Sequence, residues 1–597
     1  MEEGTRVTPL GKIISIFLIL GLVGVGAFLI LRNKPQEPNK GGGGGSTAQL
    51  PAPPPSPGAP PAPPPAAPPS PPPPAGGQDP KTEAPDASSV TTVKEYKYVP
   101  ADKLPAVRGA GAYKWDEKTK TVRFSYNVWA GWLPVVAANR GTKPNDDSVF
   151  FKKHGFRVEL VLMDDPIAAR DAFAAGEVHA LWGTLDMMVL FAPELVKDSR
   201  TSPRIYQQID WSSGGDGIVV RNTVKSVADL RGKKIALAQN SPSEYYLVSL
   251  LLSAGLKPSD VTMKYTATAF EASAAFVAEK SLDGCVSWAP DIYNIADRIS
   301  GTKILSSTAT ANKLIADVYA VRADFARDHP EIVEGLVAGI FEGMDMVKAN
   351  PADPCKWMAD AFGMQPDVVT SMMGDAHPTN FAENVQFFLN SSNPTNLERS
   401  WKNAGIVYQK LGRISSPVPF DQVMDFSVIQ KIQQKGSFSA HKDESKPSFT
   451  PGEVKELAEA PILTQTIRIN FYPNSSNPYE PARDASGNAI SGRLYDPNVD
   501  ATLEQVGRLA GQFGRAYIKI VGHTDSSMKG RVPEKAVKDL SDARAAAIKQ
   551  ALIDKFKFDP DKFKVEGKGW DDPADAKDPT NQALNRRVEV NVYPPEK

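Results

Sequence analysis

The longest uninterrupted hydrophobic run in the chain lies near its start, at residues 13–31. As an α-helix this run would span about 28 Å, which matches the hydrocarbon core of a bilayer. Lys12 and Arg32 flank it, and it ends in large apolar residues, whereas small residues precede the cleavage site of a secretory signal. The pattern therefore predicts a retained transmembrane helix at 13–31 behind a short tail, 1–12. Basic residues are balanced on its two sides, so charge leaves the orientation open.

From residue 121 onward, short β-rich runs alternate with amphipathic stretches. The first series predicts strands at 122–128, 156–163 and 180–184, with helices at 133–140 and 166–176. A second series begins at 218 and predicts strands at 233–238, 261–265 and 283–288, with helices at 243–254 and 270–279. This alternation is typical of α/β lobes with a parallel sheet covered by helices. Two such lobes joined by crossing strands form a hinged cleft that holds a ligand at the carboxyl ends of the strands.

The C-terminal part of the chain has a different order of elements. Strand patterns at 466–473, 516–525, 563–570 and 585–592 are interrupted by helical patterns from about residue 503 and at 540–556. The order strand, helix, strand, helix, strand, strand predicts an α+β domain at 461–597.

Composition adds two linkers to this picture. Proline makes up 16 of the 25 residues at 51–75, after a run of five glycines at 41–45. Such a segment favours extended polyproline II, so we expect 32–95 to be a disordered spacer, of which the proline tract alone reaches about 75 Å. A second linker is predicted at 437–460, between the middle module at 96–436 and the C-terminal domain.

Charge and cysteine content exclude several classes of protein. The formal net charge of −1 offers no polycation for phosphates, which argues against a nucleic-acid partner. Cys285 and Cys355 form no CxxC pair, so we expect two separately buried thiols, with one disulfide as the alternative. The chain has no GxSxG, P-loop or HExxH motif, and we therefore predict neither an enzyme nor a cofactor or metal site.

The middle module resembles a family of solute receptors. The resemblance lies in SVADLRGKKIALAQNSPSEYYLVSLLLSAGLKPSDV at 226–261 and in DGCVSWAPD at 283–291. These stretches are similar to the periplasmic binding proteins of nitrate, sulfonate, taurine and thiamine-precursor ABC transporters, over about 122–351. The resemblance implies the two-lobed periplasmic-binding-protein fold.

Three groups of residues in this module are candidate ligand contacts. Trp129 and Trp132 follow the first predicted strand, Ser241 and Ser243 open a helix in the second lobe, and Trp288 and Asp291 stand where the resembled family often contacts ligand. Hydroxyls at a helix N-terminus favour an oxyanion, whereas tryptophans favour a quaternary ammonium or a ring. The plainer alternatives are helix capping by the serines and a core role for the tryptophans. The class of solute stays open.

The C-terminal domain resembles the OmpA-like peptidoglycan-binding domain. Four motifs occur in order: GHTD at 522–525, LSDARA at 540–545, GKGW at 567–570 and NRRVEV at 585–590. The resemblance implies that Asp525 and Arg544 bind the diaminopimelate of the stem peptide and that Thr524 adjoins them. An Asp suits the ammonium and a bidentate Arg the carboxylate of such a zwitterion. The stretch between Asp525 and Arg544 is a few residues longer than the family pattern, and Val537 replaces a usual asparagine.

Together these features predict a periplasmic solute-binding protein that is anchored in the inner membrane and tethered to peptidoglycan. It would capture a small solute for an ABC importer, with a permease as a further partner, or for a sensor. The alternative is a structural envelope tether whose middle module contacts another protein. A flagellar stator subunit is disfavoured because 13–31 lacks the ionisable residue that a proton-driven stator needs.

Overall fold

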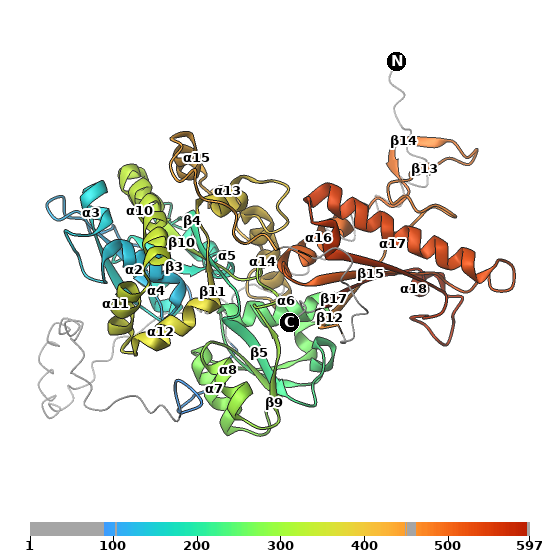
Figure 1. Cartoon of the computed structure of the whole chain (residues 1–597), viewed down its shortest axis with the longest axis horizontal. Helices are drawn as coiled ribbons and strands as arrows, with labels where there is room; N and C mark the ends of the chain where they lie inside the picture. The colour runs from blue at the N-terminus through green and yellow to red at the C-terminus, as the bar shows by residue number, and fades with distance from the viewer. Residues whose placement is uncertain (1–88, 102–103, 448, 450–460, 594–597) are drawn as a thin grey trace, which may run out of the picture. The chain divides into compact units, whose positions relative to one another are not determined.

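The computed structural model describes residues 89–101, 104–447, 449 and 461–593 (Figure 1). All of them fall in one compact unit, Asp86–Lys597. The predicted membrane helix at 13–31 and most of the predicted spacer lie outside the described residues. Every helix in the described part of the chain is too short or too polar to cross a bilayer.

The first lobe is built on a six-stranded sheet in the order β11-β4-β10-β3-β1-β2. β1 runs parallel to β2 and β3, whereas β10 is antiparallel to β3 and β4. Its strands are β1 Thr121–Tyr126, β2 Arg157–Leu162, β3 Ala180–Thr184, β4 Pro203–Ser212, β10 Ala316–Arg322 and β11 Ala376–Pro378. The connecting helices are η1 Ala130–Trp132, α2 Leu133–Asn139, α3 Val149–His154, α4 Pro166–Ala174, α5 Leu185–Leu195 and α9 Ala323–Asp328. The strands and helices expected in the first series are present.

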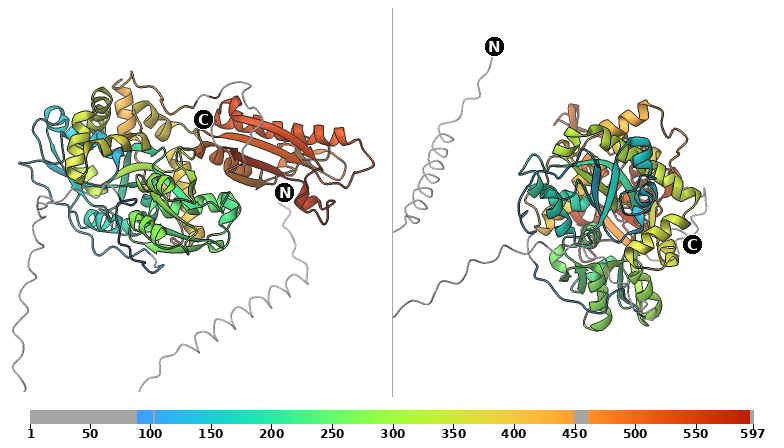
Figure 2. Two further views of the ribbon diagram at one scale, coloured as in Figure 1. Left: turned by 60° about the horizontal axis from the view of Figure 1, so that its bottom comes forward. Right: turned by 90° about the vertical axis from the view of Figure 1, so that its left-hand side faces the viewer.

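The second lobe contains a five-stranded sheet in the order β7-β6-β8-β5-β9, drawn in green in Figure 2. β6 is parallel to β7 and β8, and β5 is antiparallel to β8 and β9. The strands are β5 Asp216–Arg221, β6 Lys234–Ala238, β7 Thr262–Thr266, β8 Gly284–Trp288 and β9 Thr302–Ser307. Its helices are η2 Val227–Leu230, α6 Pro242–Ser253, η3 Pro258–Asp260, α7 Ala269–Ala278 and α8 Asp291–Arg298. The two lobes predicted from sequence are therefore both present.

Two chain crossings join the lobes, one between β4 and β5 and the other between β9 and β10. They are hydrogen-bonded to each other, because the Ser212 and Thr308 hydroxyls lie 2.8 Å apart and Gly214 N donates to Thr308 Oγ1 at 2.9 Å. These bonds are buried, so the crossings form one shared connection between the lobes.

Helices that follow β10 complete the middle module. α10 packs on α2, and α14 packs on α5 and α6. The bounds are α10 Pro330–Ala349, α11 Ala352–Phe362, α12 Pro366–Met372, η4 Met373–Asp375, α13 Phe381–Leu389, α14 Leu397–Leu411, η5 Phe420–Gln422 and α15 Ser427–Gln434. The two cysteines are free and buried, in β8 and α11, as the sequence favoured.

The segment before the first lobe lies against the second lobe. Thr92 donates its backbone N–H and its hydroxyl to Asp291 Oδ1, at 2.8 and 2.7 Å. The Tyr96 and Tyr98 hydroxyls both donate to Glu279 Oε1. Residues 89–95, which the composition assigned to the spacer, therefore have defined contacts.

The C-terminal domain has a four-stranded sheet in the order β12-β17-β15-β16, with α17 packed on β15 and β16 (Figure 2). The elements are β12 Leu463–Ile467, α16 Val499–Gln512, β15 Tyr517–His523, α17 Glu534–Phe556, η6 Pro560–Lys562, β16 Phe563–Gly569, α18 Gln582–Asn585 and β17 Val588–Tyr593. This is the expected βαβαββ order. The hairpin of β13 Pro481–Arg483 and β14 Ala489–Leu494 was not expected.

Candidate functional sites

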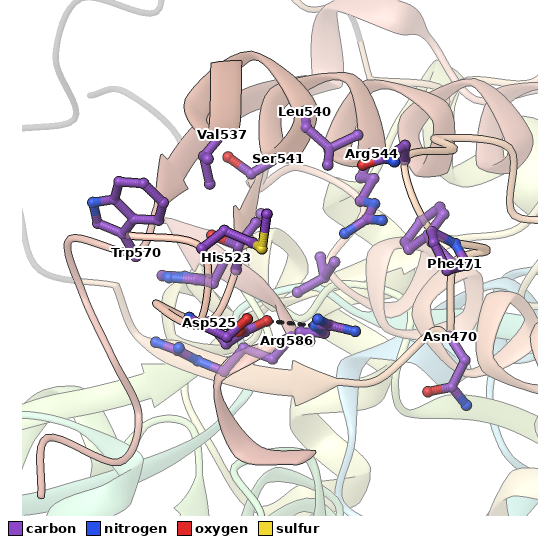
Figure 3. Close-up of a pocket in the computed structure, with 18 of the residues that line it drawn as sticks. Asn470, Phe471, His523, Asp525, Val537, Leu540, Ser541, Arg544, Trp570 and Arg586 are labelled. Carbon is purple, nitrogen blue, oxygen red and sulfur yellow. Dashed lines mark hydrogen bonds and ion pairs between the residues drawn. The ribbon is translucent and has the colours of Figure 1, made fainter. Parts of the chain in front are cut away.

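A cavity of about 640 Å³ lies in the C-terminal domain. The end of β15, the first turns of α17, the segment after β12 and the start of β17 line it. Figure 3 shows Arg544 pointing from α17 toward Asp525 and Arg586, with Phe471 beside it. All three residues that the sequence assigned to wall binding, Thr524, Asp525 and Arg544, line this cavity.

Asp525 is buried at the end of β15 and is held by two hydrogen bonds. Its Oδ1 accepts the backbone N–H of Ser527 at 2.9 Å, and its Oδ2 accepts Nε of Arg586 at 2.5 Å. Burial raises the pKa of Asp525, but hydrogen bonds from Ser527 and Arg586 outweigh burial and lower the pKa below its usual value. The carboxylate is therefore ionised at neutral pH.

Arg544 is fixed at one end and open at the other. Its Nε donates to Ser475 O at 3.0 Å, and its guanidinium lies 4.9 Å from the centre of the Phe471 ring. Burial and the neighbouring Arg586 lower the pKa of Arg544 to about 10, so the group stays charged at neutral pH. Among the described residues, neither terminal nitrogen of Arg544 donates a hydrogen bond. The bidentate edge of the guanidinium is therefore open for an anionic group.

The sequence reasoning missed Arg586, although this residue lies in the quoted NRRVEV motif. The side chain is 48% exposed and forms an ion pair with Asp525. The next residue, Arg587, is buried and pairs with Glu589. Both arginines line the cavity, but only Arg586 is paired with Asp525. The available signal was the pair of basic residues within the quoted motif.

Three further features of the C-terminal domain lie at the cavity: the Thr524 hydroxyl, the turn after Asp525 and His523. The Thr524 hydroxyl is buried with no hydrogen-bond partner among the described residues, so it is available to a ligand. The longer stretch after Asp525 forms a turn that places Met528 and Val532 at the cavity rim, while α17 begins at Glu534. His523 is buried beside Glu589, with Nε2 3.6 Å from Oε2. No cluster of the described residues has the composition of a metal site.

In the middle module, the two candidate tryptophans of the first lobe have different surroundings. Trp132 is fully buried, donates its indole N–H to Asn127 Oδ1 at 2.7 Å and packs on Phe124. Trp129 donates to Asp210 Oδ2 at 3.1 Å. Its ring reaches the crossing between the lobes, because a Cβ on Gly215 would lie 2.3 Å from it. Both rings are buried in the core, and Trp129 is the one that lies beside the crossing between the lobes.

The serines at the start of α6 do not cap it with their side chains. The Ser241 hydroxyl donates to Ala238 O at 2.9 Å, and the buried Ser243 hydroxyl has no partner among the described residues. Glu244 occupies this helix start: its Oε2 accepts Asn240 N at 3.0 Å, and its Oε1 accepts Arg413 Nη2 at 2.6 Å. The Glu244 carboxylate therefore lies at the start of α6, where the sequence favoured an oxyanion.

Trp288 and Asp291 both have contacts within the chain, although the buried indole N–H of Trp288 has no hydrogen-bond partner among the described residues. The Trp288 ring packs edge-to-face on Phe270, with centroids 5.5 Å apart. Asp291 accepts both hydrogen bonds from Thr92, and burial raises its pKa to about 6. Asp291 therefore holds the segment before the first lobe.

Comparisons with known proteins agree with the two modules. Residues 146–353 match the family model described as NMT1/THI5 like, and residues 491–587 match the OmpA family. The chain therefore carries an NMT1/THI5-like domain followed by an OmpA-family domain, as the sequence resemblance predicted.

Individual relatives cover the two modules separately. The taurine-binding periplasmic protein of Escherichia coli (strain K12) is 28% identical over 209 residues, which is 34% of this chain and 62% of that protein. Outer membrane protein Omp38 of Acinetobacter baumannii is 29% identical over 148 residues, 25% of this chain and 35% of Omp38. Among solved structures, the aliphatic sulphonate-binding protein SsuA from Escherichia coli aligns with a TM-score of 0.41 and 19% identity, covering 51% of this chain and 96% of that one. The chain thus spans about three fifths of the taurine-binding relative.

Proposed function

We propose that the protein is a periplasmic solute-binding protein fixed to the cell wall: its C-terminal domain binds the diaminopimelate of peptidoglycan, and its middle module binds a small solute. We further infer that 13–31 anchors it in the inner membrane and that the solute passes to an ABC permease or a sensor. Two tethers would hold the receptor at high effective concentration near such a partner.

The observation that carries the wall-binding part is one cavity with a fixed carboxylate and an open guanidinium. Asp525 suits the ammonium of a zwitterionic amino acid, and the free edge of Arg544 suits its carboxylate. Arg586 adds a second positive charge beside Asp525. A ligand with one ammonium and an adjacent carboxylate matches this set, which supports the side-chain end of diaminopimelate as the group bound.

The two-lobed architecture supports solute binding by the middle module. Lobes connected by two crossings open and close as rigid bodies in proteins of this architecture, and the ligand lies at the strand ends between them. The NMT1/THI5-like match and the binding proteins among the relatives favour a receptor over an enzyme.

One observation favours the alternative of a structural tether with a middle module that contacts another protein. Trp132, Ser241 and Asp291, three of the candidate solute contacts, have internal hydrogen-bond partners. A tether without solute would retain no small molecule on purification.

Retention of the full-length protein by sacculi that contain diaminopimelate tests the wall-binding function. Asp525→Ala and Arg544→Ala should each weaken retention about thirtyfold or more, because each leaves the other half of a buried charged contact unpaired. Asp539→Ala is the matched control, since Asp539 lies on α17 with 62% of its side chain exposed and pairs with Lys535. Unchanged retention of the Asp525 and Arg544 variants would reject the site.

A further inference from the structure

Three polar side chains stand side by side where the parallel strands of the first lobe end. Thr184 at the end of β3 is the register partner of Asp317 in β10, and Asp317 is the register partner of Asp210 in β4. Directly opposed residues on adjacent strands point to the same face of a sheet. Thr184, Asp317 and Asp210 therefore form a row, called the acid row below, at the edge where a ligand binds in this architecture.

Two more carboxyls join the acid row. Asp186 lies in the first turn of α5, two residues after Thr184, and Asp216 is the first residue of β5, just after the crossing. The four acids are at most 5% exposed. None of the ion pairs formed among the described residues includes Asp186, Asp210, Asp216 or Asp317. The four carboxyls are thus buried without an ion pair, and the basic group that acts on Asp210, His377, pairs with Glu383 instead.

Burial of these acids is costly for the chain alone. Burial raises the pKa of Asp186 to about 6 and that of Asp210 and Asp216 to about 7. Burial, followed by the nearby charge of Asp210, raises the pKa of Asp317 well above its usual range. A buried carboxylate without a countercharge is strongly disfavoured, and a bound cation would remove that penalty.

Several acceptor atoms in this cluster are left without a donor. Tyr408 donates to Asp186 Oδ2, Trp129 donates to Asp210 Oδ2, and the Asp210 and Asp317 side chains hydrogen-bond to each other. Oδ1 of Asp186 and Oδ1 of Asp210 have no partner among the described residues. Asp210 is completely buried. Unsatisfied buried acceptors are rare in folded proteins, and a ligand that donates hydrogen bonds would satisfy them.

The aromatic neighbours indicate which kind of cation fits. Trp129 spans from Asp210 to Gly215 at the crossing, so its indole is the aromatic ring in direct contact with the acid row. An indole next to carboxylates suits an organic ammonium or amidinium, because the cationic group can lie against the ring face. The carbon skeleton of the ligand can contact the same ring. The described residues contain no cluster suited to a metal ion. The aromatic ring therefore favours an organic cation over a bare metal.

We propose that the middle module binds a small organic cation, whose ammonium or amidinium group lies against Asp210 and Asp317 and whose carbon skeleton contacts Trp129. This inference rests on the proposed solute-binding function and specifies the chemistry of that solute. It differs from the taurine and sulphonates named for the relatives, which carry an anionic sulfonate. The start of α6, where such an anion was considered, is occupied by Glu244.

Native mass spectrometry of the full-length protein, purified in mild detergent from cell extract, would identify the class of any bound solute. Isothermal titration then compares pairs matched in size and opposite in charge: tetramethylammonium and guanidinium against methanesulfonate and nitrate, with calcium chloride as a metal probe. We expect a cationic mass in the first experiment and heat of binding only from the organic cations in the second.

Isosteric variants locate the binding site. Asp210→Asn and Asp317→Asn should each weaken cation binding about thirtyfold or more, because a charged contact with a buried partner is lost. Asp297→Asn is the control, since Asp297 is an exposed acid on α8. Both acid-row variants should retain a cooperative thermal transition by tryptophan fluorescence, which reports that the middle module folds because eight of the nine tryptophans lie within 96–436.

Each other outcome has a separate meaning. An anion bound in place of a cation would overturn this inference and leave solute binding intact. Binding of calcium alone would replace the organic cation by a metal, and cation binding unaffected by the Asn variants would exclude the acid row. Absence of any bound molecule in both experiments would overturn the inference together with the solute-binding function and favour the tether.

Discussion

Nε of Arg586 lies 2.5 Å from Oδ2 of Asp525 in the cavity of the C-terminal domain. The acid expected to receive an ammonium group is therefore already oriented by a guanidinium before ligand binds. A charge-assisted hydrogen bond of this length fixes the carboxylate and keeps it ionised.

Arg586→Ala should therefore weaken retention by sacculi about tenfold, because a hydrogen bond to a charged group contributes about 1.5–3 kcal/mol and its loss leaves Asp525 less well oriented. Arg586→Lys should recover part of the affinity. Retention assays on the full-length variants measure both effects. Tighter binding by Arg586→Ala would instead mean that Arg586 competes with the ligand for Asp525.

Val537→Asn should strengthen wall binding several-fold. Val537 lines the cavity from α17, at the position where the OmpA-like pattern usually has an asparagine. An amide there adds one hydrogen bond, which contributes about 1 kcal/mol. Titration with a diaminopimelate-containing stem peptide measures the change, and Lys535→Asn on the exposed side of α17 is the control. Equal affinities would mean that the longer turn after Asp525 keeps the ligand away from residue 537.

Gly131→Ala should abolish solute binding and leave wall binding unchanged. A Cβ at this position would lie 1.6 Å from Asp210 Oδ2 and 2.5 Å from Trp129 Nε1, so the pair must separate. Gly374→Ala is the matched control, because its Cβ would meet open space. Calorimetry for solute and sacculus retention for the wall site are the two measurements. Solute binding by Gly131→Ala at the original affinity would remove the Trp129–Asp210 pair from the site.

The solute-free middle module should lose stability as pH rises. The pKa of Asp186 is raised to about 6, and that of Asp210 and Asp216 to about 7. A carboxyl with a higher pKa in the folded state favours folding while protonated. Its contribution is complete below the unfolded value of about 3.9 and is lost as pH rises through the folded value. Each acid should remove up to about 1.4 kcal/mol per pH unit in that window.

Thermal unfolding followed by tryptophan fluorescence measures this effect, since eight of the nine tryptophans lie within 96–436. The transition should move to lower temperature between about pH 4.5 and about pH 7.5. The double variant Asp210→Asn with Asp317→Asn should show a smaller decline, and Asp297→Asn an unchanged one. Equal pH profiles for all three proteins would contradict protonation of the acid row in the folded state.

Periodicity and motif order were sufficient to predict the lobes, the βαβαββ order and the presence of Asp525 and Arg544 in one site. These features depend on local patterning and on residues that stand within short motifs. Asp525 and Arg544 could be assigned because four motifs occurred together in the expected order. Their role in wall binding stays a prediction.

The acid row was not predictable in the same way. Asp210 and Asp317 are separated by more than a hundred residues, and only the pairing register of β4 with β10 brings them together. The bonds from Thr92 to Asp291 were likewise not predictable, because they join residues almost two hundred positions apart; a ligand contact at Asp291 stays a prediction. The local patterns of a single sequence do not predict such long-range pairings.

The bonds from Thr92 to Asp291 and from Tyr96 and Tyr98 to Glu279 fasten the incoming chain to the second lobe. When the residues before Thr92 are held in place, a force along the chain acts first on the second lobe. It reaches the first lobe only through the two crossings. A force between the two ends of the protein would therefore act on the two crossings, which set how far the lobes can separate.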